Sequence, residues 1–232
     1  MDLNGRVAVI TGATGDLGRV AARRLLVTGA SLVLVGTSRR RLDELAATLP
    51  EAEARVTTVE ADLTTDAGGE VLAAALDSGP GRADLLLHVV GGWSGGQSLL
   101  EVPLDTLRDL LARHVWTTTH AIRATVPRML ANGWGRVIAI STPMATRPGP
   151  GQAAYAAAKA AQEALVLGLA RDVAGSGVTA NVLQVREIKS ETPELRRSWT
   201  TPDEIVGAVL YLASDAAGVV SGARIPVLSG PL

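Results

Sequence analysis

Seven short apolar runs alternate with helix-like segments along the 232 residues, and this alternation constrains the fold more than any other feature of the chain. Runs that are apolar throughout are typical of parallel strands buried on both faces. Because crossovers between parallel strands are right-handed, the pattern predicts an α/β fold: a single Rossmann-like, doubly wound domain over residues 1–232, with helices on both faces of a seven-stranded parallel sheet. The expected strands are 6–11, 31–36, 55–60, 84–90, 135–141, 178–184 and 223–228, and the expected helices are 16–28, 41–49, 65–76, 103–131 with a bend near 111–114, 152–174 and 202–214.

The composition excludes several classes of function. A net charge of −1 gives no reason to expect a nucleic-acid surface, and the absence of cysteine excludes disulfides and thiol chemistry. His88, His114 and His120 lack the spacing of metal ligands, so we expect no metal. The chain shows no signal peptide and no apolar run of membrane-spanning length. We therefore expect a cytoplasmic protein that acts on a small molecule and binds no membrane.

A glycine-rich turn follows the first expected strand. Its glycines allow a tight turn and keep side chains away from a ligand, and the helix that begins near residue 16 directs its first amide groups and its positive dipole end at the turn. This arrangement suits a pyrophosphate; the alternative is a βα turn that needs glycine only for its geometry. A P-loop is excluded because no Gly-Lys-Ser/Thr follows. The residues expected to bind a dinucleotide here are Gly12, Thr14, Gly15, Asp16, Leu17 and Gly18.

The residues after the second expected strand indicate which nicotinamide cofactor would bind. An acidic residue there would bind the adenosine ribose hydroxyls and repel a 2′-phosphate, and none is present. Thr37, Ser38 and Arg39 instead offer hydroxyls and a guanidinium that suit a phosphate, which favours NADP(H) over NAD(H). The alternative is that these residues only begin the next helix. After the third strand, Asp62 either accepts a hydrogen bond from the adenine amino group or caps the helix that follows.

Tyr155 and Lys159 lie four residues apart in an alanine-rich segment that we expect to be helical, so their side chains share one face. A neighbouring ammonium favours the phenolate, and we expect it to lower the tyrosine pKa from its usual value of ~10. Such a tyrosine can give its proton to a carbonyl oxygen as hydride reaches the carbon, or act in reverse. The alternative is a solvated pair on a helix surface.

Five features follow one another along the chain: the glycine motif 11–18, Ala-Asp-Leu at 61–63, Ser-Thr at 141–142, Tyr155-x-x-x-Lys159 and Asn181. In this order and spacing they resemble the short-chain dehydrogenase/reductase family over nearly the whole chain. The resemblance implies a hydride-transferring oxidoreductase with a nicotinamide cofactor, forming a homodimer or homotetramer through its two long helices. We expect hydride transfer to a carbonyl or to a conjugated ring. It implies that Tyr155 is the general acid/base, that Lys159 tunes it and holds the nicotinamide ribose, and that Thr142 replaces the family's serine beside the substrate oxygen. The further cofactor contacts it implies are Leu63, Gly91 and Ile188.

Several positions depart from the family pattern. Asp16 stands where the commonest form has glycine, and residues 88–91 read His-Val-Val-Gly in place of Asn-Asn-Ala-Gly. His114 takes the place of the family's helix-kinking asparagine, where it either relays protons as a catalytic residue or only fills space. These departures also raise a second hypothesis, a nucleotide-binding scaffold or sensor with weak catalysis.

A local resemblance points to one branch, the dihydropteridine reductases. The turn 91–96 (Gly-Gly-Trp-Ser-Gly-Gly) is similar to that branch's glycine-tryptophan loop, and segments 115–119 and 198–200 are similar too. The branch reduces a flat quinonoid pterin, which could stack on Trp93; the alternative is that Trp93 is a hydrophobic plug over the loop. The family's substrate lid falls at 186–201, where Trp199 is the expected substrate contact.

Overall fold

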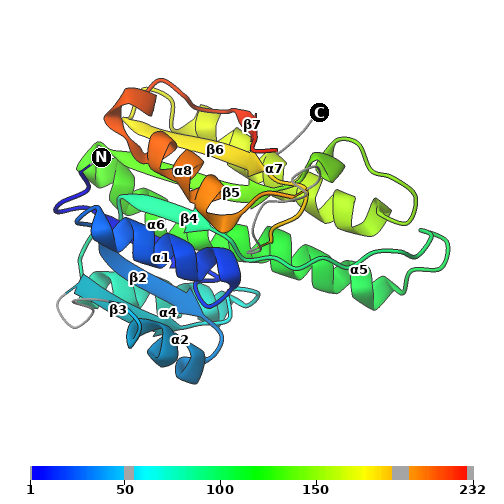
Figure 1. The fold of residues 1–232 in the computed structure, drawn as a ribbon, viewed down its shortest axis with the longest axis horizontal. Coiled ribbons are helices and arrows are strands. Elements are labelled where there is room, and N and C mark those ends of the chain that lie inside the picture. Colours follow the sequence, from blue (N-terminus) through cyan, green and yellow to red (C-terminus); the bar gives the residue numbers. More distant parts are fainter. Residues whose placement is uncertain (1, 50–54, 190–198, 229–232) are drawn as a thin grey trace.

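The computed structural model describes residues 2–49, 55–189 and 199–228. Seven strands form one sheet in the order β3-β2-β1-β4-β5-β6-β7, and each neighbouring pair is parallel (Figure 1). The expected seven-stranded parallel sheet is therefore confirmed. The strands are β1 (Val7–Thr11), β2 (Ser31–Gly36), β3 (Val56–Glu60), β4 (Leu85–His88), β5 (Gly135–Ser141), β6 (Val178–Gln184) and β7 (Arg224–Pro226).

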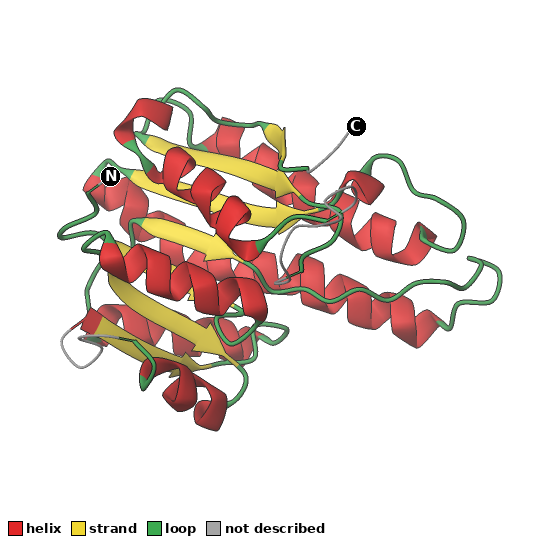
Figure 2. Ribbon diagram, in the orientation of Figure 1, coloured by secondary structure: helices red, strands yellow, loops and turns green. Residues whose placement is uncertain are grey.

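Helices cover both faces of this sheet (Figure 2). In β1, Ala8 and Ile10 are buried with the core of one face, whereas Val7 and Val9 are buried with the core of the other. Strands between two helical layers need apolar side chains on both faces, which explains the unbroken apolar runs. One face carries α1 (Asp16–Val27), α2 (Arg39–Ala46) and α8 (Pro202–Ala213); the other carries α4 (Asp66–Ser78), α6 (Thr117–Asn132) and α7 (Ala153–Asp172), while α5 (Leu104–Leu111) extends away from the sheet.

The expected strand 223–228 is shorter in the structure, where β7 spans Arg224–Pro226. Three further elements differ from the expectation for local reasons. The expected strand 84–90 ends at His88, because Val89 and Val90 leave the sheet and line the cavities described below. The expected helix 103–131 consists of α5, a π-helical turn (Ala112–Trp116) and α6, so the expected bend is a π-turn. Helix α2 begins two residues earlier than expected because Ser38 caps it.

The strand order reverses beside β1, with β2 on one side of it and β4 on the other. In a doubly wound sheet, ligands bind outside the carboxyl ends of the strands at this switch point. A ligand site is therefore expected at the carboxyl edge of the sheet, beside β1. Within the described ranges, none of the helices combines the length and hydropathy that crossing a membrane requires.

Candidate active site

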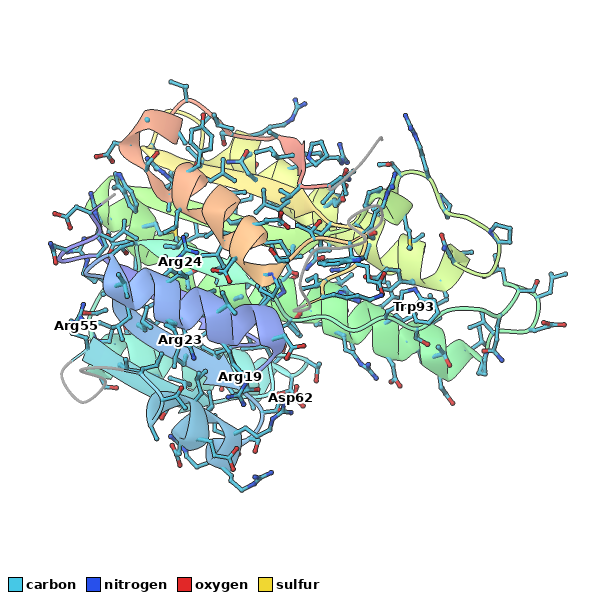
Figure 3. The ribbon with its side chains drawn as sticks, viewed as in Figure 1. Arg19, Arg23, Arg24, Arg55, Asp62 and Trp93 are labelled. Carbon is cyan, nitrogen blue, oxygen red and sulfur yellow. The ribbon has the colours of Figure 1, made fainter. Side chains whose placement is uncertain are left out.

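Two adjoining cavities form a trough along the carboxyl edge of the sheet. The first, of about 430 Å³, lies at the ends of β1, β2, β3 and β4, and the second, of about 640 Å³, lies at the ends of β4, β5 and β6. They share Val89, Val90 and Gly91 in their walls. Figure 3 labels Asp62 and Trp93, which line the first and the second cavity respectively. The expected cofactor residues that line the first cavity are Gly12, Thr14, Gly15, Thr37, Asp62, Leu63 and Gly91; those lining the second are Gly91, Tyr155, Lys159 and Ile188.

The three glycines of the turn have different roles. Gly12 has a φ of +70°, which favours glycine. A Cβ on Gly18 would lie 2.5 Å from the Gly12 carbonyl oxygen, so this glycine lets α1 pack close to the turn. A Cβ on Gly15 would have its nearest neighbour at 3.5 Å, and Gly15 is exposed in the wall of the first cavity. Since packing does not require glycine at 15, the open space there fits the pyrophosphate of a dinucleotide.

The amino terminus of α1 faces the same turn. Gly15 is its N-cap and offers no side chain to the first amide groups of the helix, which begins with Asp16, Leu17 and Gly18. These amide groups and the positive end of the helix dipole suit an anion. The contribution expected from residues 16–18 is therefore that of their backbone, since none of the three lines the cavity with its side chain.

The arginine at the end of β2 that faces the cavity is one that the sequence did not single out. The guanidinium of Arg39 donates to the hydroxyl of Thr58 at 2.7 Å, so it is directed toward β3. Ser38 accepts a bond from the backbone amide of Arg41 at 3.5 Å and so acts as the helix cap. The side chain of Arg41 lines the cavity beside Thr37. Ser38 was the sequence signal that could have identified Arg41. A helix capped by Ser38 begins at Arg39, so Arg41 is its third residue.

Asp62 lines the same cavity and does not cap α4. Its carboxylate accepts from the backbone amide of Thr64 at 3.0 Å and from the Thr64 hydroxyl at 2.7 Å, whereas Thr65 is the N-cap of α4. The helix-cap alternative for Asp62 is therefore wrong. The two bonds to Thr64 hold the Asp62 carboxylate at the cavity wall.

Tyr155 and Lys159 line the second cavity from helix α7, together with Thr142 at the end of β5. The Lys159 ammonium donates to the Ile140 carbonyl and to Gln162 Oε1, each at 2.9 Å. Burial lowers the pKa of Lys159 to about 7, against a smaller raising effect of Glu163. Burial also raises the pKa of Tyr155 to about 12, so the expected lowering by the neighbouring ammonium is not found. The tyrosine is consequently a protonated phenol at neutral pH.

Two hydroxyls accompany Tyr155 in this cavity. Thr142 Oγ1 accepts from the backbone amide of Met144 at 3.4 Å, which leaves its hydroxyl proton for another acceptor. Ser141 is buried, also lines the cavity, and its Oγ has no hydrogen-bond partner in the described part of the chain. A buried hydroxyl without a partner is uncommon and marks a place for a ligand or a water. Ser141 was not among the expected site residues.

His114 lies behind this wall, in the π-helical turn. Its ring is buried and meets the ring of Tyr155 edge-on, with 5.5 Å between the ring centroids. Its Nε2 lies 3.4 Å from the Gly92 carbonyl, and its Nδ1 has no partner among the described residues. Burial, and secondarily the charge of Lys159, lower the His114 pKa to about 3, so the ring is neutral at neutral pH. A neutral imidazole with an open Nδ1 can accept a hydrogen bond there.

His88, in contrast, has a partner at both ring nitrogens. Nδ1 lies 2.8 Å from Thr11 Oγ1, and Nε2 lies 3.3 Å from Thr117 Oγ1. Burial lowers its pKa to about 3, with smaller effects of Lys159 and His114. These contacts tie β4 to β1 and α6, so His88 has a structural role at the floor of the trough.

The two tryptophans expected at the substrate site differ. Trp93 is 61% exposed and lines the second cavity, whereas Trp199 is 8% exposed and lines neither cavity. Ile188 pairs with Thr200 in an isolated parallel bridge, which holds the chain beside Trp199 against the body of the protein. The expected lid, 186–201, falls mainly on 190–198, which lies outside the described residues.

Comparison with known proteins shows the family of the chain. The family model described as "short chain dehydrogenase" matches residues 6–201. The chain belongs to the short-chain dehydrogenase family. Its membership makes the protein an NAD(P)-dependent oxidoreductase, and the open glycine at 15 and the free first amides of α1 fit such a cofactor.

Two curated short-chain dehydrogenases illustrate the similarity. The chain is 32% identical to 2,3-dihydroxy-2,3-dihydro-p-cumate dehydrogenase of Pseudomonas putida, over 99% of this chain and 95% of that protein. It is 31% identical to 1,6-dihydroxycyclohexa-2,4-diene-1-carboxylate dehydrogenase of Pseudomonas putida, over 98% and 93% respectively.

Two solved short-chain dehydrogenase structures also match over nearly their whole length. L-sorbose reductase from Gluconobacter frateurii, complexed with NADPH and L-sorbose, has a TM-score of 0.91 and 25% identity, covering 100% of this chain and 98% of that chain. A 7α-hydroxysteroid dehydrogenase complexed with NADH has a TM-score of 0.89 and 26% identity, covering 100% and 96%. These relatives hold nicotinamide cofactors of both kinds.

Proposed function

We propose that this short-chain dehydrogenase interconverts a carbonyl and an alcohol on a ring-containing small molecule, with Tyr155 as general acid/base and NADP(H) as the preferred cofactor. The observation that carries the proposal is the position of Tyr155 and Lys159, one helical turn apart in the wall of a 640 Å³ cavity that adjoins the cavity of the glycine turn. A solvated surface pair would not be buried in this way: Lys159 is 4% exposed.

The chemistry follows from the protonation states of the side chains. A bound reduced nicotinamide supplies the hydride. Because the Tyr155 pKa is about 12, its phenol holds a proton at neutral pH and can donate it to the substrate oxygen. The Thr142 hydroxyl donates a second hydrogen bond to that oxygen and so fixes the carbonyl. In the reverse direction, the tyrosine accepts the proton of the alcohol.

We assign supporting roles to two residues near Tyr155, namely Lys159 and His114. When protonated, Lys159 stabilises the phenolate that remains after proton transfer; its charge is lost as the pH rises through its pKa of about 7. His114 is the proposed proton relay, since its neutral ring packs edge-on against Tyr155 and its Nδ1 is open.

The substrate class is inferred from the relatives and the cavity together. Both curated relatives named above are dehydrogenases whose names specify a dihydroxylated ring that carries a carboxylate. Trp93 presents an exposed indole at the rim of the second cavity, which suits a flat ring. We infer a cyclic substrate, with the remaining wall of this cavity formed by residues such as Met144 and Val185.

The preference for NADP(H) rests on the end of β2. Thr37 and Arg41 line the first cavity there, and none of residues 37–42, which directly follow β2, is acidic. A titration of tryptophan fluorescence with NADPH and, separately, NADH tests this preference. We expect NADPH to bind about tenfold more tightly, which corresponds to about 1.4 kcal/mol. Arg41→Gln should remove the preference, whereas Arg39→Gln, the matched control, should keep it.

The other results of this titration separate the alternatives. Tighter binding of NADH would overturn the NADP(H) proposal and favour the dihydropteridine-reductase-like alternative, with a quinonoid pterin as the next substrate to test. Tight binding of a cofactor without turnover of any carbonyl substrate would favour the scaffold or sensor. Binding of neither cofactor would contradict the enzyme proposal.

We also propose that the protein is a cytoplasmic homodimer or homotetramer. Large apolar side chains are exposed along the helices that extend from the sheet: Leu104 is 66% exposed, Trp116 is 52% exposed and Leu165 is 37% exposed. Apolar side chains of this kind suit an interface between copies of the chain. Light scattering of the purified protein measures the mass, and a monomer at micromolar concentration would contradict the proposal.

A further inference from the structure

A third cavity, of about 510 Å³, extends the trough beyond the reaction cavity. It lies at the carboxyl ends of β5, β6 and β7, where Ser141 pairs with Gln184 and Gln184 with Pro226. It shares Thr142, Met144 and Arg186 with the reaction cavity. A molecule that meets Tyr155 in the reaction cavity can therefore reach past Thr142 into this third cavity.

The third cavity carries positive charge. Arg147, Arg186 and Arg224 line it, and its described lining contains no aspartate or glutamate. We call these three residues and the space between them the arginine annex. Guanidinium groups form planar pairs of hydrogen bonds that match a carboxylate. Three of them around one cavity are suited to an anionic group of a ligand.

A buried carboxylate holds one member of the annex in place. Arg224 Nε donates to Glu163 Oε2 at 2.5 Å, and the other oxygen of Glu163 accepts from Gln184 Nε2 at 2.9 Å. Glu163 is fully buried, whereas the Arg224 side chain is 45% exposed. The bond to Glu163 uses Nε, which leaves the two terminal amino groups of Arg224 as further donors. The guanidinium is thus positioned before a ligand arrives.

Arg147 supplies a second, adaptable charge. It is exposed on the loop that follows β5, and in the described ranges its guanidinium forms no ion pair. An arginine whose charge is unpaired, next to one that is fixed, gives the annex a net positive field toward the reaction cavity.

We propose that the arginine annex binds the carboxylate of the substrate while the ring carbonyl or alcohol lies at Tyr155. This inference rests on the proposed function and adds to it: the enzyme selects ring substrates that carry an anionic group at the far end from the reacting carbon. Neutral rings of the same shape should bind more weakly, because they leave the annex without a partner.

The test measures binding without requiring turnover. Isothermal titration calorimetry of the full chain, with saturating NADPH and without it, compares cyclohexanecarboxylate with its neutral isostere cyclohexanecarboxamide. We expect the carboxylate to bind about tenfold more tightly at low salt, and the difference to shrink as salt rises. Arg147→Gln should remove most of this preference, and Arg224→Lys, which keeps the charge beside Glu163 but loses the planar fork, should reduce it. Arg23→Gln, an exposed arginine on α1, is the control and should leave it unchanged.

Three results would overturn the proposal that the arginine annex binds a carboxylate. They are equal binding of the two probes, an unchanged preference in Arg147→Gln, and displacement of the carboxylate by inorganic phosphate at a concentration below that of the carboxylate itself. The last result would assign the cavity to a phosphate group. Failure of NADPH to bind would contradict the proposed function, yet the preference for the carboxylate in the cofactor-free arm would still decide the annex.

Discussion

The two edges of the sheet differ in whether their buried polar atoms have hydrogen-bond partners. At the amino edge, Asp84 is fully buried and its carboxylate accepts from the Val7 backbone amide at 2.8 Å and from Arg82 at 2.6 and 2.8 Å. At the carboxyl edge, His114 Nδ1 and Ser141 Oγ are buried with no partner in the described part of the chain. One edge is closed by its own side chains, and the other has polar atoms available for a ligand.

The amino edge also has an atom without a hydrogen bond, but a ring covers it. Arg136 Nε lacks a hydrogen-bond partner among the described residues, and the Arg136 guanidinium lies 4.3 Å from the Trp134 ring centre. Arg6 packs on the same ring at 3.9 Å, and the indole donates to Asp215 at 3.0 Å. Two cations on one indole are stabilised by its π face. The comparison indicates that this edge contributes stability and the opposite edge contributes the chemistry.

The largest effect on stability should come from replacing the buried Asp84 at the amino edge. Asp84→Asn keeps one acceptor for Val7 but leaves the arginines Arg6 and Arg82 without their buried anion. We expect the free energy of unfolding to fall by about 3 kcal/mol, because the buried side chain loses its charge-assisted hydrogen bonds to both arginines. Urea unfolding measures this loss. The turnover per folded molecule should stay unchanged, and a loss of turnover without a loss of stability would break the comparison.

Alanine substitutions at two glycines of the turn should have different effects, one on stability and the other on cofactor binding. Gly18→Ala places a Cβ 2.5 Å from a backbone oxygen, so we expect a loss of about 2 kcal/mol in the free energy of unfolding. Gly15→Ala has a nearest neighbour at 3.5 Å, so we expect unchanged stability and weaker NADPH binding, by about tenfold. Thermal unfolding and the fluorescence titration are run on both variants. Equal destabilisation by both substitutions would contradict the distinction between them.

The smallest effect should appear in acid. His88 and His114 have folded pKa values of about 3, below the unfolded value of 6.5, so between these values the unfolded chain binds more protons. Stability should therefore fall as the pH drops below about 6.5, by about 1 kcal/mol between pH 6.5 and 5.5 for each histidine. His114→Asn should remove one of the two contributions to this slope. Urea unfolding at pH 6.5, 6.0 and 5.5 measures it, and an identical slope in the variant would contradict the burial of a neutral ring.

The fold could be predicted because both faces of every central strand are buried, which leaves an apolar run in the sequence. The same rule predicted a fourth strand that was too long. Val89 and Val90 are apolar and line the cavities, but they lie outside β4. Helical periodicity sufficed to bring Tyr155 and Lys159 together, since a spacing of four residues fixes their relation on one helix.

Other parts of the site depend on contacts that the sequence does not contain. The start of α2 determines that Arg41, and not Arg39, faces the cavity, and this start depends on the Ser38 cap. The pKa of Tyr155 depends on how deeply α7 is buried, which outweighs the neighbouring ammonium. Trp199 lies in polar sequence yet is buried by tertiary packing.

If Tyr155 transfers the proton, Tyr155→Phe should abolish turnover and leave cofactor binding intact. The measurement is the steady-state kcat for reduction of a ring ketone such as 3-oxocyclohexanecarboxylate, together with the Kd of NADPH, for the wild type and the variant. We expect kcat to fall by at least about 100-fold while the Kd stays the same, because the substitution removes only the hydroxyl that donates the proton. A variant with the turnover of the wild type would contradict the account.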